Sequence, residues 1–232
     1  GGRFGVYGTD KGASLIYRGL FALHQRGQEG AGSVGSDGAK VRSVKGLGLV
    51  SDVFSGKSWD ALPGNLGIGH VRYSTTGSSR LENVQPLVAE CVDGMWAIAH
   101  NGNLVNAARL RRMYQEAGAI FQTSTDSEVL VHLLADPMFR NRPRRVSRAL
   151  NELEGSFSFL LMTRDCVMAA RDRRGFRPLS IGKVGDAWVL SSETCAFDLI
   201  HAKFVRDVEP GEIVIINQDG LKSVQAFPAH ER

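Results

Sequence analysis

Four residues in this sequence have groups suited to binding a free amino acid, together with the carbonyl group at the end of that amino acid's side chain. Arg72 follows a short apolar run, and a guanidinium can hold an α-carboxylate through two parallel hydrogen bonds, which lysine does less well. Asp126 comes just before an expected helix and can receive an α-ammonium group. Asn101 and Gly102 follow a second apolar run. An amide next to a glycine N–H can form an oxyanion hole, because glycine lets the backbone approach a ligand closely.

Hydrolysis of the side-chain amide of glutamine needs each of these functions, together with a nucleophile and a base that takes its proton. Each residue also has an ordinary structural explanation. An arginine after a strand is more often part of a structural ion pair, Asn-Gly is more often a turn, and Asp126 alone would be a helix cap. Only their joint occurrence in this order favours a site.

The expected elements place these residues at strand ends. The early strands are predicted at 4–7, within 32–44 around an Asp37-Gly38 turn, at 67–71 and at 96–100. Helices are predicted at 13–25, closed near Gly27, at 106–117, at 127–134 with Asp126 or Ser127 as N-cap, and at 145–153. After Gly155, short β-runs are predicted at 157–162, 167–170, 179–181, 188–190 and 213–216, with a brief helix at 196–200. We therefore expect a single α+β domain over 1–232, with two stacked, mainly antiparallel sheets and helices outside.

Composition excludes several classes of protein. The 232 residues are 43% hydrophobic and 22% charged, as in an ordinary globular protein. The net charge of +4 comes without a basic stripe, which argues against a nucleic-acid partner. No apolar run approaches the roughly 18 residues of a membrane helix, so no membrane association is expected. The three cysteines form no CxxC pair, which favours a reducing, cytoplasmic location. The missing initiator Met indicates a processed protein, an excised domain or an edited sequence.

Two further groups of residues have structural interpretations. A basic run is expected to be a solvated loop and helix face, with docking to a partner domain as the alternative; it comprises Arg140, Arg142, Arg144, Arg145 and Arg148. Three histidines flank different segments without an acidic ligand at a suitable spacing, so structural hydrogen bonding is favoured over a metal site; they are His24, His70 and His100.

The segments around the site residues resemble the glutaminase domain of the amidophosphoribosyltransferase family. These enzymes open purine synthesis by moving ammonia from glutamine onto phosphoribosyl pyrophosphate. The resemblance spans nearly the whole chain and implies the four-layer αββα sandwich of N-terminal-nucleophile hydrolases. Its segments are HQRGQEGAG at 24–32, GLGLV at 46–50, HVRYST at 70–75, ENVQPL at 82–87, HNGNL at 100–104, STDSE at 124–128, RPLSIG at 177–182, SETCAFD at 192–198 and VEPGE at 208–212.

The resemblance assigns a role to each matching position. It implies that Arg72 holds the glutamine carboxylate and Asp126 its amino group. Asn101 and Gly102 match the oxyanion hole, and Gly27 matches a residue lining the pocket beside the nucleophile.

The resemblance also implies a loop that closes over bound glutamine. Tyr73 and Ser74 belong to that loop, where Thr75 and Thr76 would assist.

The chain departs from the family at the nucleophile itself. Relatives begin Cys-Gly, with the thiol attacking and the free α-amine, of pKa about 7.7–8.0, acting as base. Here Gly1-Gly2 stands in their place, so the thiol is missing and the domain is expected to be inactive as a glutaminase. Arg3 replaces a small apolar residue of the family. Neither Cys91 nor Cys166 belongs to a site motif, which argues against a substitute nucleophile.

No cofactor or metal is expected in this chain. Cys195 matches a position that ligates an iron–sulfur cluster in some relatives, but the other cluster ligands and the magnesium site belong to a downstream half. One thiolate cannot hold a cluster, so Cys195 is expected to be a buried structural cysteine. The implied partners are glutamine, a phosphoribosyltransferase domain or subunit that should follow near the end of this chain, and further copies of the chain in a homo-oligomer.

Three functional hypotheses follow. The first is the glutaminase domain of an amidophosphoribosyltransferase, which would hydrolyse glutamine to glutamate and ammonia once Gly1→Cys is restored. The second is a non-catalytic domain that binds glutamine or scaffolds a transferase. The third is a dead decoy or purely structural partner domain.

Overall fold

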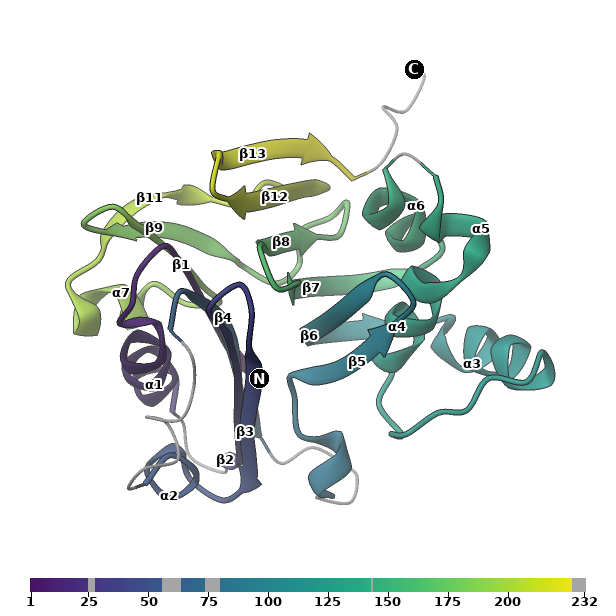
Figure 1. Ribbon diagram of the computed structural model, residues 1–232, viewed down its shortest axis with the longest axis horizontal. Coiled ribbons are helices and arrows are strands. Elements are labelled where there is room, and N and C mark those ends of the chain that lie inside the picture. The colour runs from purple at the N-terminus through teal and green to yellow at the C-terminus, as the bar shows by residue number, and fades with distance from the viewer. Residues whose placement is uncertain (25–27, 56–63, 74–79, 143, 227–232) are drawn as a thin grey trace.

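The structure, a computed structural model, describes residues 1–24, 28–55, 64–73, 80–142 and 144–226. Within these residues, two β-sheets of seven and six strands pack face to face, and helices cover the outer face of each sheet (Figure 1). Every strand pair in both sheets is antiparallel. The predicted α+β, four-layer αββα sandwich is therefore confirmed.

The seven-stranded sheet, sheet A, has the first strand of the chain in its interior. Phe4 and Val6 of this strand pack under the helices, whereas Gly5 and Tyr7 face the other sheet, as expected from the alternation of side chains along a strand. The strands in spatial order are β11 (Lys203–Asp207), β9 (Ser180–Val184), β10 (Ala187–Ser191), β1 (Gly2–Tyr7), β4 (Leu66–Tyr73), β2 (Gln28–Ser36) and β3 (Val41–Leu47).

The six-stranded sheet, sheet B, contains the long strand that delivers Asn101 and Gly102. The inward residues Ala97 and Ala99 of this strand belong to the core between the sheets, and its outward residue Ile98 packs under helices. The strands in spatial order are β13 (Gly220–Gln225), β12 (Glu212–Asn217), β8 (Val167–Arg171), β7 (Gly155–Met162), β6 (Gly94–Leu104) and β5 (Leu87–Cys91).

The helices divide between the two outer faces (Figure 1). On the side of sheet A lie α1 (Gly12–Ala22), α2 (Val50–Val53) and α7 (Cys195–Ile200). On the side of sheet B lie α3 (Ala107–Glu116), α4 (Glu128–Ala135), α5 (Pro137–Arg140) and α6 (Arg145–Asn151), while the short 3-10 turn η1 (Leu81–Asn83) precedes β5. One apolar core lies under each group of helices and a third between the sheets. In the described residues no helix is both long and apolar enough to cross a membrane.

The first helix is shorter than predicted, and the predicted N-cap of α4 is confirmed only in its position. The first helix ends at Ala22 rather than at Gln25, and Gly27 lies outside the described residues. The N-cap residue of α4 is Ser127, but neither its side chain nor that of Asp126 caps the helix. Ser127 Oγ instead lies 3.2 Å from His100 Nδ1, and the Asp126 carboxylate accepts the backbone N–H of Leu104.

The prediction that Cys195 is buried was wrong. Cys195 is exposed at the first position of α7, because this short helix buries Ala196, Phe197 and Ile200 instead. Cys166 is half-buried in the turn before β8 rather than inside an apolar strand.

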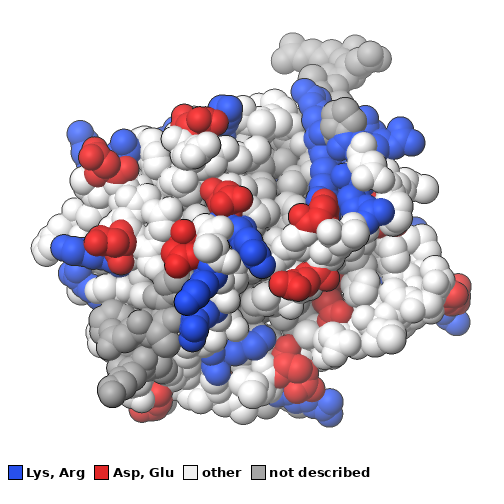
Figure 2. Space-filling model, in the orientation of Figure 1, with Lys and Arg blue, Asp and Glu red and all other residues white. Residues whose placement is uncertain are grey.

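The basic run is only partly solvated. Figure 2 shows basic side chains gathered over α5 and α6, and Arg142, Arg144 and Arg148 are exposed. Arg145 is different, because its guanidinium bonds the carboxylate of Asp93 and the carbonyl of Leu134 and lies over the ring of Trp96. This arginine therefore links α6 to the turn of the hairpin formed by β5 and β6.

Candidate functional site

A hollow of about 260 Å³ lies where the ends of β4 and β6 meet the loop before α4. Arg72 and Tyr73 end β4, and Asn101 and Gly102 lie near the end of β6. The hollow brings together six of the predicted site positions, namely Gly1, Arg72, Tyr73, Asn101, Gly102 and Asp126. The other three, Gly27, Ser74 and Thr75, lie outside the described residues.

Pairing between strands places residue 1 in this hollow. Gly2 pairs with Val71 at the end of β4, so Gly1 lies directly beside Arg72. From the opposite sheet, Asn101 Nδ2 lies 3.4 Å from the carbonyl oxygen of Gly1. The site is therefore built across the interface between the two sheets.

Gly102 has a conformation that glycine alone adopts readily. Its φ is +154°, and a Cβ at this position would lie 2.3 Å from the carbonyl oxygen of Ser156 on β7. Absence of a side chain keeps β6 paired with β7 while the backbone of Gly102 borders the hollow.

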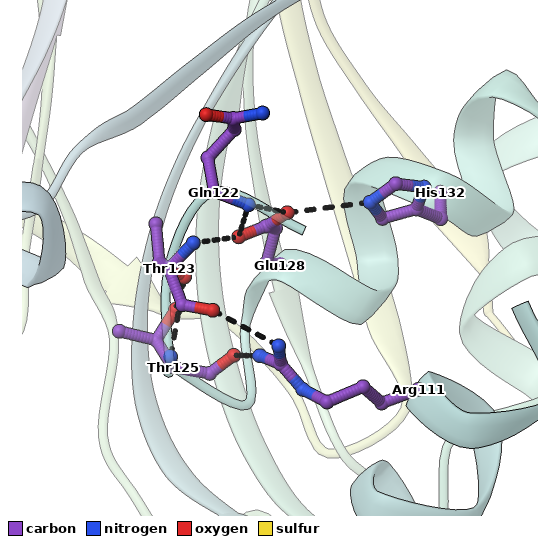
Figure 3. A network of polar contacts seen from close by, with 6 residues as sticks. All are labelled: Arg111, Gln122, Thr123, Thr125, Glu128 and His132. Atoms are coloured by element: carbon purple, nitrogen blue, oxygen red, sulfur yellow. Dashed lines mark hydrogen bonds and ion pairs between the residues drawn. The ribbon is translucent and has the colours of Figure 1, made fainter. Parts of the chain in front are cut away.

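Asp126 is positioned by contacts on both sides of its loop. Arg111 on α3 donates from Nη1 to the carbonyl oxygen of Thr123 at 2.9 Å and from Nη2 to that of Thr125 at 2.8 Å (Figure 3). The Glu128 carboxylate accepts the backbone N–H groups of Gln122 and Thr123. Burial raises the pKa of Asp126, while the nearby Arg111 cation acts in the opposite direction.

A second set of contacts ties this loop to η1. The Asn83 side chain accepts the backbone N–H of Ser124 at 3.0 Å and donates to its hydroxyl at 2.8 Å. Gln85 accepts the backbone N–H of His100 at 2.6 Å, and both Asn83 and Gln85 line the hollow. The family resemblance includes their segment, but the sequence alone does not predict that these two side chains line the hollow.

Arg72 and Tyr73 differ in how they are held. Within the described part of the chain, the Arg72 side chain has no hydrogen-bond or ion-pair partner. The Tyr73 hydroxyl donates to the carbonyl of Leu23 after α1. Burial raises the pKa of Tyr73 to about 12, so this hydroxyl stays protonated at neutral pH.

Two buried histidines also line the hollow. His100 stacks on Phe159, with ring centroids 4.3 Å apart, and burial lowers its pKa to about 3. Burial also lowers the pKa of His70 well below its ordinary value. The prediction of structural hydrogen bonding holds in part for His100, through Ser127. For His70 it holds only weakly: its ring contacts the backbone of His100, but neither ring nitrogen makes a hydrogen bond of good geometry with the described residues.

A second hollow, of about 190 Å³, also borders Gly1. It shares Gly1, Tyr73 and Asn101 with the first hollow and adds the cations of Arg3 and Arg177. Its remaining lining residues are Gly2, Leu23, Pro178, Ser192 and Glu193. Burial, Arg3 and Arg177 lower the pKa of the Gly1 α-amine to about 5, which makes this amine neutral at pH 7.

The space around Gly1 is tight. An ideal Cβ on residue 1 would lie 2.2 Å from the carbonyl oxygen of Val71 and 2.8 Å from Nε2 of His70. A side chain at position 1 therefore requires residue 1 or its neighbours to shift.

The described residues offer no metal or cluster site. No group of three or more His, Cys, Asp or Glu side chains among them is arranged to hold a metal ion. Cys195 is exposed on α7, while Cys91 lies on β5 of the other sheet and Cys166 precedes β8. A cluster that needs several thiolates does not fit this arrangement.

Comparisons with known proteins agree with this geometry. Residues 70–198 match the family described as the glutamine amidotransferase domain. The chain is 47% identical over 223 residues to the amidophosphoribosyltransferase of Bacillus subtilis, covering 96% of this chain and 47% of that protein. It is also 47% identical over 232 residues to the chloroplastic amidophosphoribosyltransferase 2 of Arabidopsis thaliana, covering 99% of this chain and 41% of that protein.

Solved structures give the same result. The glutamine phosphoribosylpyrophosphate amidotransferase from B. subtilis, complexed with ADP and GMP, superposes with a TM-score of 0.89 at 44% identity, over 98% of this chain and 49% of that chain. A glutamine aminotransferase class-II domain protein from Silicibacter pomeroyi shares the fold at 17% identity, with a TM-score of 0.65 over 98% of this chain and all of that chain.

The fold and the matched family define the class: this chain belongs to the glutamine amidotransferase domain family. Within it, the chain is a class II glutamine amidotransferase domain of the amidophosphoribosyltransferase type. It spans about half the length of the curated relatives it matches.

Proposed function

We propose that this chain is the glutaminase domain of an amidophosphoribosyltransferase of purine biosynthesis and binds L-glutamine in the hollow beside Gly1. One observation carries the proposal: a cation at Arg72 and an anion at Asp126 lie on the same hollow as Asn101 and Gly102. Glutamine presents a carboxylate and an ammonium at one end and a carboxamide at the other. The first two match Arg72 and Asp126, and the carboxamide would then reach the neighbourhood of Gly1.

The proposed reaction begins with attack by a residue-1 thiol on the carboxamide carbon. Asn101 Nδ2 and the backbone N–H of Gly102 would hold the negative charge that develops on the carbonyl oxygen. The α-amine of residue 1 would take the thiol proton and pass it to the leaving ammonia. The resulting thioester would be hydrolysed by water to glutamate. Gly1 supplies no thiol, so the Gly1 protein would bind glutamine without this chemistry.

A second candidate is a domain that binds without catalysis as its natural role. Gly1 and the buried Arg3 favour this candidate, because they place two departures from the family pattern at the centre of the site. Under either candidate, a phosphoribosyltransferase domain or subunit is the proposed partner, since the full-length relatives are amidophosphoribosyltransferases.

The test compares the Gly1 protein with Gly1→Cys and with Gly1→Ala, which adds a Cβ but no thiol. Glutamine binding is followed by calorimetry and ammonia release by a coupled assay. We expect the Gly1 protein to bind glutamine and only Gly1→Cys to release ammonia. If Gly1→Cys binds glutamine but releases none, the catalytic proposal fails and the binding candidate stands. If no form binds glutamine, both fail.

A further inference from the structure

Arg3 is a buried cation without a counter-ion among the described residues. It is 1% exposed, and its place on β1 directs it into the space between the sheets, on the face shared with Gly5 and Tyr7. Its nearest hydrogen-bond acceptors are the carbonyl oxygens of Ser158 and Pro178, each at 3.5 Å. Among the described residues, no carboxylate forms an ion pair with it. A buried charge in this state is costly unless a further group compensates it.

The polar groups around Arg3 are also incompletely paired. Arg3 Nε and the hydroxyl of Ser158 are buried without a hydrogen-bond partner among the described residues, and the ring nitrogens of His70 have only a weak contact with the backbone of His100. His70 is the cross-strand neighbour of Arg3, and Ser158 pairs with Asn101 on the facing sheet. Because buried polar groups in folded proteins are nearly always hydrogen-bonded, this concentration beside Gly1 indicates a place for a polar ligand.

The charges facing the two hollows favour an anion. The α-groups of a bound amino acid would occupy Arg72 and Asp126. Three charged side chains then remain, the cations of Arg3 and Arg177 and the carboxylate of Glu193. The two buried imidazoles are neutral at pH 7, as is the Gly1 amine. The end of the site that receives the ligand's side chain therefore has a net positive charge, which the uncharged carboxamide of glutamine does not use.

We propose that Arg3 and Arg177 make this site select an α-amino acid whose side chain ends in a carboxylate over glutamine. The inference rests on the proposed function, because it uses the same contacts at Arg72 and Asp126. Since the two hollows share Gly1, Tyr73 and Asn101, a side chain extending past Gly1 enters the space lined by both arginines. Arg3 and Arg177 are specificity-determining residues in this arrangement. The ligand carboxylate would supply Arg3 with a negative charge and with acceptors for its hydrogen bonds.

Calorimetry with three ligands tests the proposal: L-glutamine, L-glutamate and L-2-aminoadipate, which is one methylene longer than glutamate. We expect one of the two acidic ligands to bind about tenfold or more tightly than glutamine, as a charge-assisted hydrogen bond provides. Arg3→Met should abolish this preference, so that the acidic ligands no longer bind more tightly than glutamine. Arg177→Gln should reduce it, whereas Arg174→Gln, an exposed arginine of the same loop outside both hollows, should leave it unchanged.

The outcomes separate this inference from the proposed function. Tighter binding of glutamine than of both acidic ligands overturns the inference and leaves the function intact. Binding of none of the three overturns both. Formate and phosphate are titrated alone, and Arg3-dependent binding of these ions without any preference for the acidic amino acids would assign the site to a free anion and overturn the inference. If Arg3→Met does not fold, Arg3→Gln and the exposed Arg177→Gln carry the same comparison.

Discussion

Arg3 on β1 and His70 on β4 are cross-strand partners in the space between the two sheets, and the described residues do not complete the hydrogen bonds of either side chain. The Arg3 cation is one reason that the pKa of His70 is low, after burial and the Gly1 amine. Sheet pairing thus places a positive charge and an uncharged imidazole beside Gly1. The predictions below address the amino-acid contacts, the loop that carries Asp126, the backbone at Gly102 and the buried histidines.

The first prediction concerns the two ends of the ligand. Arg72→Met and Asp126→Asn each remove one charged partner of a bound amino acid, so we expect glutamine affinity to fall by about 10- to 100-fold. Arg42→Gln, an exposed arginine on β3, is the control and should bind normally. Calorimetry at pH 7 makes the comparison, and unchanged affinity in both site variants would contradict the assigned pocket.

The second prediction concerns the position of Asp126. Arg111 holds the carbonyl groups of Thr123 and Thr125, so Arg111→Met should loosen this loop and weaken glutamine binding by about tenfold, with the fold retained. Arg112→Met is a close control, because Arg112 is the next residue on α3 and forms only an exposed ion pair with Glu116. Equal glutamine affinity in the two variants, measured by calorimetry, would show that Arg111 has no positioning role.

The third prediction separates backbone strain from a steric clash. Gly102 and Gly94 both have positive φ, but only a Cβ at Gly102 meets other atoms within 4 Å. Gly94→Ala should cost about 1–3 kcal/mol in the free energy of unfolding, from strain alone. Gly102→Ala should cost about 1–3 kcal/mol more, because its Cβ lies against the backbone of Ser156. Urea unfolding of both variants checks the difference, which equal losses would refute.

The fourth prediction concerns the pH dependence of stability. The unfolded chain protonates His100 near an ordinary pKa of 6.5, whereas the folded protein does so only near 3. Between these values the unfolded state binds more protons, so the free energy of unfolding should fall as pH falls. The pKa of His70 is shifted in the same direction, so it contributes with the same sign. Each group contributes at most about 1.4 kcal/mol per pH unit.

The measurement for this prediction is urea unfolding at several values between pH 7 and pH 4. His100→Gln removes one of the two titrating groups, so its stability should depend less steeply on pH, whatever its absolute stability. If the free energy of unfolding of His100→Gln depends on pH as steeply as that of the parent protein, His100 is not held neutral in the folded state.

Much of the fold follows from the periodic patterns of the sequence. The strands and helices that these patterns do not predict share one property, which is the lack of a buried, periodic face. The strands predicted at 4–7, 67–71 and 96–100 lie within β1, β4 and β6, whose buried residues make the pattern clear. By contrast, β11 and β13 are edge strands without a fully buried residue, so no clear apolar alternation marks them. The short helices α2 and α5 have four residues each, too few for a periodic signal.

The hollow was predictable only in its motif residues. Arg72, Asn101 and Asp126 stand in segments that resemble a known family, and the structure brings these residues to one place. The burial of Arg3 was not predictable from its residue type, because arginine on a strand is usually exposed. Its position follows from β1 lying between two other strands, with sheet B packed over it. That is a tertiary relationship which no local pattern contains.

The interior position of β1 has a consequence for the order of events during synthesis. Phe4 pairs with Gly69 on β4 and with Ser191 on β10, so one neighbour of the first strand is made early and the other late. Until β10 leaves the ribosome, one edge of β1 has no strand to pair with and requires protection from intermolecular pairing. Ser192 and Glu193, which follow β10 directly, complete the surroundings of Gly1. The pocket is therefore completed late in the synthesis of this domain, even though Gly1 precedes all of its other lining residues in the chain.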